Sequence, residues 1–394
     1  MRDVVIVSAC RSAIGKFGGS LKPLTGKKIA APIMKAALER AGIEDFGIID
    51  DVRFGCCMER ADEMNVARCA AIEAGIPKEI PAVTINRVCD SAMEAIVSGM
   101  MFIKAGYMDI VLAGGVESMS NVPFLSFDTR WGVRYRNSNI VFVDGLYQGL
   151  HAGFDIIMGL TAENLCEKYG FTREELDEVA LRSHNNAEKA TNSGRFKDEI
   201  VPIEVPLPKG KSMIFDKDEH FRPGLTMEQL ARLPPAFKKD GLVTAGNSSG
   251  INDGAAAVVL MSKEKAEELG VTPLVKIVGY GVAGVDPYYM GEGSVPATKK
   301  AFKMTGLSMK DIELIEVNEA FAACYLVAER QLGFDREIAN VNGSGIGLGH
   351  PVGCTGARIV VTLIYEMIKR NLNIGLATLC GGGGLGMTLI VQRE

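Results

Sequence analysis

The chain has 394 residues, of which 47% are hydrophobic and 23% charged, and its formal net charge is −5 at pH 7. This length exceeds what one hydrophobic core usually organises, so two or three structural units are expected. The composition is typical of a soluble globular protein, and the sequence has no basic run of five residues, which argues against nucleic-acid binding. It also lacks an apolar stretch of membrane-spanning length and a signal peptide, so we expect a cytoplasmic protein.

The cysteine and histidine content limits the possible chemistry. The nine cysteines are an odd number, which argues against a disulfide framework in a chain of this size. Their spacing, together with the four histidines, matches no zinc site, so no metal is expected. Most of the cysteines are expected to be buried, reduced thiols.

Predicted strands and helices alternate from the N-terminus. A buried strand covers Val4–Val7, a helix with an apolar stripe ends just before Gly42, and a strand follows over residues 48–54. The same order begins again with a strand over residues 274–278, and Gly306 lies 264 residues after Gly42. Two such series at a near-constant offset indicate an internal duplication.

The duplication continues downstream through two helices. Cys89 precedes a predicted helix over residues 92–104, and His350 precedes another over residues 356–370. A strand that ends in glycine follows each helix. This alternation indicates mixed α/β sheets covered by helices. Two similar halves packed together would bring their equivalent turns to a shared axis, so Cys89, His350 and Cys380 could meet at one site.

A different region separates the two copies. Residues 120–249 are richer in proline and charge and contain the only tryptophan, Trp131. We predict an inserted lobe here, with helices near residues 159–169 and 173–193, and expect it to supply substrate specificity. The predicted units are an N-terminal half over residues 1–119 completed by 250–273, the lobe over 120–249, and a C-terminal half over 274–394.

Cys89 is the first candidate nucleophile. It lies at a predicted strand-to-helix turn, where the helix N-terminus would lower the pKa of the thiol and favour the reactive thiolate. Asp90 and Ser91 offer local capping, although a charged Asp90 facing the sulfur would oppose thiolate formation. The sequence around Cys89 is equally compatible with a cysteine of the hydrophobic core.

Glycine clusters surround two further candidates. His350 lies in a run of small residues where the backbone can approach a ligand closely, and it is a candidate general base for Cys89. Cys380 ends a predicted buried strand and precedes four glycines, whose N–H groups could form an oxyanion hole. The alternatives are an ordinary buried histidine and a tight turn between strands.

Asn318 follows the predicted strand over residues 312–317. Its amide could hold a water molecule or donate a hydrogen bond to a substrate carbonyl. The alternative is a helix N-cap, because Asn followed by Glu is typical of a helix start.

These motifs together resemble the thiolases, most nearly the acetyl-CoA acetyltransferase branch, over essentially the whole chain. Several ordered, independent motifs make this resemblance specific. They are Asn86-Arg87-Val88-Cys89-Asp90-Ser91, Gly114-Gly115-Val116-Glu117-Ser118-Met119-Ser120, Asn318-Glu319-Ala320-Phe321-Ala322, residues 340–356 and residues 380–386.

The resemblance implies a five-layered αβαβα fold of two duplicated halves with an inserted loop domain. It implies a ping-pong reaction in which Cys89 attacks an acyl-CoA thioester and His350 accepts its proton. Cys380 would then deprotonate acetyl-CoA, whose α-carbon attacks the acyl-enzyme. His350 and a water on Asn318 would form one oxyanion hole, and the N–H groups of Cys89 and Gly382 the other.

The resemblance also implies that coenzyme A and acyl-CoA are the substrates and that no further cofactor is needed. Coenzyme A would lie across the inserted lobe, and a homo-oligomer, dimer or tetramer, is expected, with the segment around Trp131 joining dimers. The expected coenzyme A and substrate contacts are Arg222, Phe237, Ala245, Ser249, Phe321 and Met158.

The chain departs from the family pattern at three places. Asp90 and Ala92 replace the usual glycines after the nucleophile, Ile157 replaces a histidine of the acetyl-specific branch, and residues 144–157 form a longer segment. Two alternatives follow: a 3-ketoacyl-CoA thiolase of broader specificity in fatty-acid degradation, and a non-catalytic acyl-CoA-binding homologue. A condensing enzyme with a second catalytic histidine is disfavoured, because Cys380 takes that histidine's place.

Overall fold

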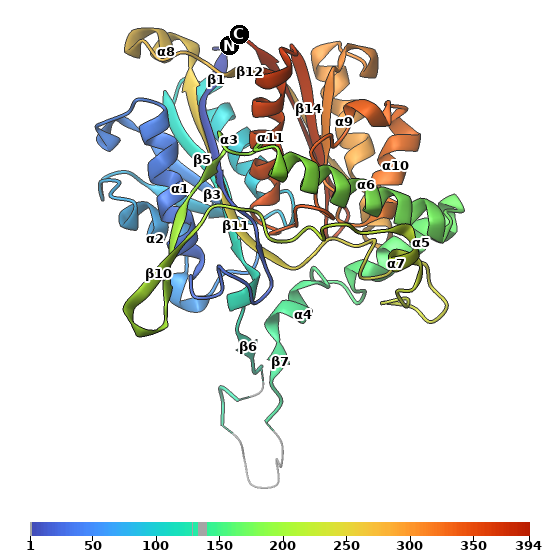
Figure 1. Cartoon of the computed structure of the whole chain (residues 1–394). Helices are drawn as coiled ribbons and strands as arrows, with labels where there is room; N and C mark the ends of the chain where they lie inside the picture. Colours follow the sequence, from blue (N-terminus) through green and yellow to red (C-terminus); the bar gives the residue numbers. More distant parts are fainter. Residues whose placement is uncertain (1, 128, 133–139) are drawn as a thin grey trace.

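The structure, a computed structural model, describes residues 2–127, 129–132 and 140–394 (Figure 1). Its main sheet has the continuous hydrogen-bonded order β13-β14-β15-β12-β1-β11-β5-β3-β4, and β9 with β10 and β6 with β7 form two separate pairs. The first half contributes β1 (Val4–Ser12), β3 (Asp51–Gly55), β4 (Ala82–Ile85), β5 (Ile110–Ser118) and β11 (Asn252–Ser262). The second half contributes β12 (Val275–Gly284), β13 (Leu314–Val317), β14 (Ile374–Gly381) and β15 (Leu385–Arg393).

The two halves share one strand topology. In the first half β1 pairs antiparallel with β11, β11 antiparallel with β5, and β5 parallel with β3. In the second half β12, β15, β14 and β13 repeat the same sequence of pairings. Among the described residues, β1 and β12 join the halves through two paired positions, Val5 with Lys276 and Ile6 with Val275. The expected duplication is therefore confirmed.

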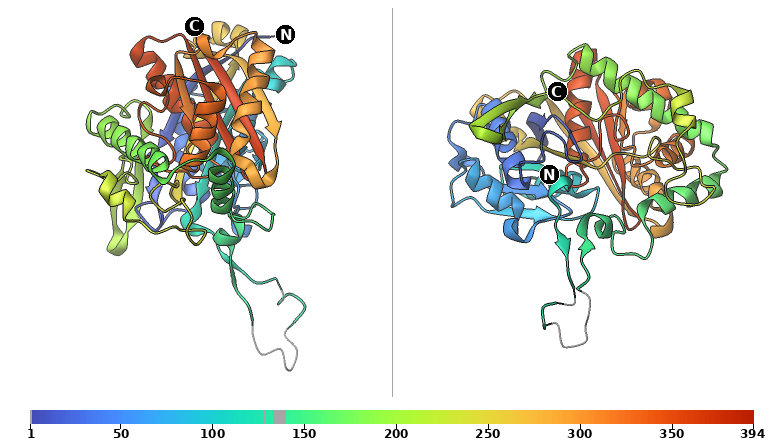
Figure 2. Two further views of the ribbon diagram at one scale, coloured as in Figure 1. Left: turned by 90° about the vertical axis from the view of Figure 1, so that its right-hand side faces the viewer. Right: turned by 60° about the horizontal axis from the view of Figure 1, so that its bottom comes forward.

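Helices divide the halves into five layers (Figures 1 and 2). The outer helices of the first half are α1 (Gly26–Arg40) and α2 (Val66–Glu73), the central ones α3 (Ser91–Lys104) and α11 (Thr355–Arg370), and the outer ones of the second half α9 (Ser294–Thr305) and α10 (Ala322–Leu332). Three buried hydrophobic clusters fill the spaces, one under each outer layer and one around α3 and α11. This order confirms the expected αβαβα fold.

Strand β1 lies in the middle of the main sheet, with a hydrogen-bonded neighbour on each side. All nine residues of β1 are buried, as expected for a strand with a covered neighbour on each side. The predicted strand over residues 48–54 is shorter than expected, because a 3-10 turn over Phe46–Ile48 precedes β3. Asp45 caps this turn by accepting a hydrogen bond from the Gly47 N–H.

The region between the halves is extended. A short hairpin of β6 (Phe124–Leu125) and β7 (Val143–Asp144) projects away from the layers in Figure 1. The chain then returns and crosses the second half. The other elements here are α4 (Gly145–Gly149), α5 (Met158–Tyr169), α6 (Arg173–Asn192), β8 (Ile200–Val201), β9 (Ile203–Leu207), β10 (Lys211–Phe215) and α7 (Met227–Ala231).

Two short elements complete the description. β2 (Gly15–Lys16) pairs with β11, and α8 (Lys263–Leu269) follows β11.

The helix α6 begins at a capping box in which Thr172 and Glu175 each bond the other's backbone N–H. Within the described residues, no helix has both the length and the apolar character needed to cross a membrane.

Candidate active site

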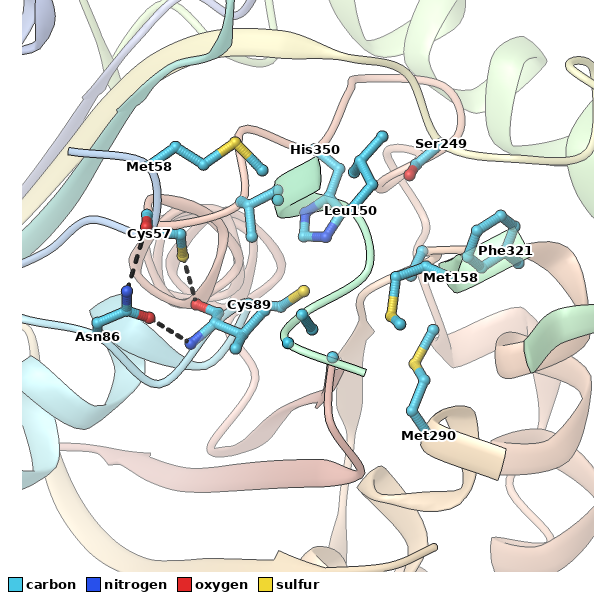
Figure 3. A pocket seen from close by; sticks show the side chains of 17 residues that line it. Cys57, Met58, Asn86, Cys89, Leu150, Met158, Ser249, Met290, Phe321 and His350 are labelled. Atoms are coloured by element: carbon cyan, nitrogen blue, oxygen red, sulfur yellow. Dashed lines mark hydrogen bonds between the residues drawn. The ribbon is translucent and has the colours of Figure 1, made fainter. Parts of the chain in front are cut away.

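A cavity of about 320 Å³ opens where turns of the two halves and the intervening region meet (Figure 3). Cys89, His350 and Gly382 all line it, although they are far apart in the sequence. The remaining lining residues are Cys57, Met58, Asn86, Val88, Gly149, Leu150, Ala152, Gly153, Met158, Ser249, Met290, Ala320, Phe321 and Val352. The wall is largely apolar, as is typical of a small-molecule site.

Cys89 lies on a strained turn. The preceding residue, Val88, has a φ of +51°, a left-handed conformation that is unfavourable for a β-branched residue. Ser91 supports this turn, because its hydroxyl donates to the Val88 carbonyl at 2.6 Å and accepts the Arg87 N–H at 2.8 Å. The Cys57 thiol also donates to the Val88 carbonyl, at 2.8 Å. The strain is thus compensated locally and fixes the Cys89 side chain at the cavity.

The Cys89 pKa is not lowered overall, contrary to expectation. Burial raises the pKa of this thiol well above its ordinary value, and the proximity of Cys380 raises it further. The Gly382 N–H acts in the opposite direction by favouring negative charge on the sulfur, but burial outweighs it. Without substrate, Cys89 is therefore a thiol, and its proton must leave as it attacks.

His350 is oriented by a threonine that the sequence analysis did not identify. The Thr355 hydroxyl donates to the Pro351 carbonyl at 2.9 Å, so it accepts the proton of His350 Nδ1, which lies 2.6 Å away. This network assigns the proton to Nδ1 and leaves Nε2 free to accept one. Burial lowers the pKa of His350 to about 3, so the ring is neutral at pH 7.

The backbone at His350 needs its preceding glycine. Gly349 has a φ of +108°, and a Cβ on it would lie 2.6 Å from the Asn252 side chain. The same Asn252 accepts the His350 N–H at 2.9 Å. Gly349 therefore permits the close contact that fixes the His350 backbone.

Asn318 lies beside the imidazole. Its amide nitrogen is 3.4 Å from Nε2 of His350, and the residue is only 1% exposed. The alternative of a helix N-cap is wrong, because α10 begins at Ala322 and Phe321 occupies the N-cap position. Glu319 instead holds this turn by accepting hydrogen bonds from the side chains of Ser183 and Asn340.

Cys380 lies behind the cavity wall. It is 2% exposed and is the second-last residue of β14, two residues before Gly382, which lines the cavity. Its interaction with the Cys324 thiol, and then burial, raise the Cys380 pKa well above its ordinary value. Cys380 in turn raises the pKa of Cys89, because charge on Cys380 opposes charge on Cys89. The structure therefore brings Cys89, His350, Asn318, Cys380 and Gly382 into one neighbourhood.

Asp90 is fully buried at the start of α3. Neither carboxyl oxygen has a hydrogen-bond partner among the described residues, and Asp90 makes no capping bond. A helix N-terminus stabilises an anion by about 0.3–2 kcal/mol, whereas burying an unpaired carboxylate costs several kcal/mol. Burial therefore prevails and raises the Asp90 pKa well above its ordinary value.

Glu117 joins a turn of each half, a role not apparent from sequence. Its carboxylate accepts the backbone N–H groups of Cys57 at 3.0 Å, Met58 at 3.1 Å and Gly353 at 2.8 Å. Cys57 and Met58 line the cavity, and Gly353 lies in the loop that carries His350. One buried side chain thus holds two walls of the site together.

Comparison with known proteins identifies the family of the chain. The model for the thiolase N-terminal domain matches residues 4–264, and the model for the thiolase C-terminal domain matches residues 271–393. The chain belongs to the thiolase family. It is 51% identical, over 99% of both chains, to a protein of Syntrophomonas wolfei named acetyl-CoA acetyltransferase.

Solved structures of other thiolases superpose over the whole chain. The acetyl-CoA acetyltransferase of Bacillus anthracis is 51% identical with a TM-score of 0.97, covering 100% of this chain and 99% of that one. The human mitochondrial 3-ketoacyl-CoA thiolase in complex with CoA is 44% identical with a TM-score of 0.95, covering 100% and 98%.

The six residues expected to contact coenzyme A in this thiolase fall into three places. Ser249, Phe321 and Met158 line the cavity with Cys89. Phe237 packs edge-on against Phe321, with 6.0 Å between ring centroids. Arg222 and Ala245 line a second cavity of about 420 Å³, together with His184, Pro223, Leu225, Gln229, Leu230, Leu233 and Gly246.

Several cavity residues of this thiolase were missed because they come from the longer segment over residues 144–157. Gly149, Leu150, Ala152 and Gly153 line the cavity from α4 and the turn after it. These residues have no polar side chains that would indicate a binding role. The extra length of the segment was the only feature of the sequence that set it apart. In the described ranges, no group of three or more His, Cys, Asp or Glu side chains could hold a metal ion.

Proposed function

We propose that this thiolase is an acetyl-CoA C-acetyltransferase, which condenses two acetyl-CoA molecules reversibly to acetoacetyl-CoA and CoA through a cysteine acyl-enzyme. The observation that carries the proposal is the meeting of Cys89, His350 and Gly382 at one cavity, with Cys380 directly behind it. The two most similar proteins described above are both named acetyl-CoA acetyltransferase.

In the first half-reaction the Cys89 sulfur attacks the thioester carbonyl of an acyl-CoA. Nε2 of His350 accepts the thiol proton during the attack, since both groups are neutral beforehand. The tetrahedral intermediate then expels CoA as a thiolate, which takes the proton of the Cys380 thiol. Cys380 is left as a thiolate, and Nε2 of His350 keeps its proton. The products are CoA and an acyl group on Cys89.

In the second half-reaction acetyl-CoA enters the emptied site. Cys380 removes a proton from its α-carbon, and the resulting carbanion attacks the carbonyl carbon of the acyl-enzyme. The bond to Cys89 breaks, and the Cys89 thiolate takes its proton back from Nε2 of His350 as the 3-ketoacyl-CoA leaves. Free CoA drives the same steps in reverse.

Two sets of donors stabilise the charge that develops on the thioester oxygens. We assign the N–H groups of Cys89 and Gly382 to the oxygen of the acyl group on Cys89. His350 and a water held by Asn318 serve the oxygen of the second acetyl-CoA. Preorganised donors of this kind in a dry site contribute about 100- to 1,000-fold to the rate each.

We assign coenzyme A to the path between the two cavities. Its pantetheine would pass Ser249, Phe321 and Phe237, and its nucleotide end would meet Arg222 and Ala245. This assignment agrees with units bounded at residues 1–119 with 250–273, 120–249, and 274–394, the middle unit binding coenzyme A. No other cofactor takes part in the proposed steps.

A 3-ketoacyl-CoA thiolase of broader chain length is the second candidate. The apolar cavity wall favours this candidate, because it includes the flexible side chains of Met58, Met158 and Met290. The chain also has Ile157 where the acetyl-specific branch has a histidine. The human mitochondrial 3-ketoacyl-CoA thiolase described above is also closely similar in structure.

One assay separates these candidates. Loss of the 3-ketoacyl-CoA absorbance is followed after addition of CoA, with substrates from four to ten carbons. Turnover of the four-carbon substrate alone supports the acetyltransferase, and turnover across the series supports the broader enzyme. Absence of turnover while CoA still binds would leave only the non-catalytic acyl-CoA-binding homologue and would overturn both proposals.

We further propose that the protein works in the cytoplasm as a homo-oligomer. The nine free cysteines are consistent with a reducing compartment. Trp131, which is 90% exposed and lies between β6 and β7 in the sequence, is a candidate contact between subunits. Part of that segment, residues 133–139, lies outside the described residues.

A further inference from the structure

Three groups that can lose a proton lie close together at the cavity wall: the Asp90 carboxyl and the Cys89 and Cys380 thiols. Asp90 directly follows Cys89, and a Cβ placed on Gly381 would lie 2.9 Å from its Oδ2, so the carboxyl packs against the residue after Cys380. A charge on Asp90 acts on both cysteines, since it opposes ionisation of each. The carboxyl therefore touches the turns that carry both sulfur atoms.

No counter-ion lies within 4 Å of Asp90 in the part of the chain that the structure describes. Arg87 is the cation that most favours its ionisation, but Arg87 pairs with Glu94 at 3.1 Å. The charged groups on elements packed against α3 are also engaged. Arg53 pairs with Asp51, Arg358 pairs with Glu316, and Glu117 accepts backbone N–H groups.

The imidazole does not supply the missing positive charge. His350 is neutral without substrate, so negative charge on Asp90, Cys89 or Cys380 would be uncompensated. In such a buried site, one ionised group strongly opposes ionisation of the next. A carboxyl has the lowest intrinsic pKa of the three, so it is the first to lose its proton as the pH rises.

We propose that Asp90 controls the protonation of the two catalytic sulfur atoms. At the pH where the enzyme works its carboxyl is neutral and does not oppose the charge that develops during the reaction. As the pH rises, Asp90 releases its proton to solvent, and its charge then holds Cys89 and Cys380 as thiols. Asp90 does not touch the substrate and acts on the reaction through the protonation of Cys89 and Cys380. Its effect on catalysis rests on the function proposed above.

The test is the pH dependence of Cys89 alkylation. Wild type and Asp90→Asn are treated with iodoacetamide from pH 6 to 11, and the labelled peptide is quantified by mass spectrometry. The substitution preserves shape but cannot ionise. The midpoint for Cys89 is expected to fall by about one to two pH units in Asp90→Asn, as expected from removing one nearby charge. An unchanged or higher midpoint would overturn the proposal.

Asp51→Asn is the matched control. Asp51 is also a buried carboxyl of the first half, 5% exposed, but it pairs with Arg53 at 2.7 Å. It is expected to leave the Cys89 midpoint at the wild-type value, and an equal shift in both variants would contradict a specific role of Asp90. If Asp90→Asn does not fold, Asp90→Ser removes the same charge and has the same expected result.

Infrared spectroscopy measures the carboxyl directly and needs no variant activity. The wild type should show a carbonyl band of a protonated carboxyl that Asp90→Asn lacks, and the band should disappear at alkaline pH. A wild-type spectrum without this band at neutral pH would overturn the proposal. The band and the alkylation shift would persist in a protein without thiolase turnover, so failure of the proposed function is distinguishable.

Discussion

A single hydroxyl sets the tautomer of the imidazole in this thiolase. Because Thr355 donates to Pro351, it can only accept from His350, and Nε2 is left as the base. Thr355→Val removes the acceptor, so both tautomers become accessible and the ring loosens. We expect kcat to fall about 10- to 100-fold with KM within about threefold, the usual effect of losing an orienting partner. Steady-state thiolysis measures both constants.

The control for Thr355→Val lies two turns further along α11. Thr362 is also fully buried, and its hydroxyl donates to Glu199 at 3.1 Å, away from the cavity. Thr362→Val should lower stability and leave kcat unchanged. Equal losses of kcat in the two variants would show that Thr355 acts only through general packing of the helix.

Substitutions of Cys89 and Cys380 are expected to block different steps of the proposed reaction. Cys89→Ser should abolish acyl labelling by acetyl-CoA, because the hydroxyl is a far weaker nucleophile in a site without a stronger base. Cys380→Ser should label normally but lose condensation by at least about 100-fold, the usual contribution of a general base. Labelling is read by mass spectrometry and condensation by acetoacetyl-CoA formation.

Cys57→Ser provides a matched control for these variants, since Cys57 is a third thiol at the same cavity. It supports the turn at Val88 and has no assigned chemical role, so labelling on Cys89 should persist. Normal condensation by Cys380→Ser would remove the base role from Cys380.

At this scale the sequence predicted the positions of the candidate reacting groups better than their charge. Glycine clusters marked the turns of His350 and Cys380, and the duplication related the turn of Cys89 to that of His350. The pKa direction at Cys89 could not be predicted, since it depends on how completely the opposite half covers the turn. Thr355 was missed because a threonine at a helix start has no distinctive pattern until its partner is placed.

Among the elements, Glu117 connects two turns that contribute residues to the cavity wall. Glu117→Gln replaces one acceptor oxygen by a donor that faces backbone N–H groups, so at least one charge-assisted bond is lost. We expect a loss of about 2–4 kcal/mol in the free energy of unfolding and a raised KM. Urea unfolding and substrate titration measure the two effects.

Glu313→Gln is the comparison for that variant. Glu313 also accepts two backbone N–H groups, from Asn373 at 2.5 Å and Ile374 at 2.9 Å, but at the start of β14 and exposed to solvent. It should lose less stability and keep the wild-type KM. A wild-type KM in Glu117→Gln would show that the two turns hold their positions without this bridge.

The order of the elements followed from hydrophobic period and glycine turns, but some details did not. The turn at Asn318 was open between a helix cap and a site residue, because Asn-Glu suits both. Tertiary contacts decided it, since Glu319 is drawn to Ser183 and Asn340 and helix α10 starts later. The lining role of residues 149–153 depends on where the lobe docks, which no local pattern encodes.

The whole molecule keeps several histidines buried and neutral. Burial lowers the pKa of His184 to about 3 and that of His220 to about 4, and the rings stack 6.3 Å apart. The folded values lie below the unfolded value of about 6.5. The unfolded chain therefore binds more protons between about pH 4 and 6.5, and stability falls as the pH falls through this window.

His184→Gln tests this linkage. The slope of unfolding free energy against pH should decrease by about 1.4 kcal/mol per pH unit between pH 4.5 and 5.5, because one proton fewer is taken up. Urea unfolding at several pH values provides the slope, and measurements between pH 7.5 and 8.5 should agree for the two proteins. Equal slopes at acidic pH would mean that His184 is charged in the folded protein.

The position of β11 has a consequence for synthesis on the ribosome. This strand lies between β1 and β5, yet residues 119–251 are made after β5 and before β11. At about 5–20 residues per second, the nascent chain holds two facing strand edges without their partner for on the order of ten seconds. Unpaired edges invite association with other chains, so we expect chaperone dependence to peak while the lobe is being translated and to end once residue 262 emerges.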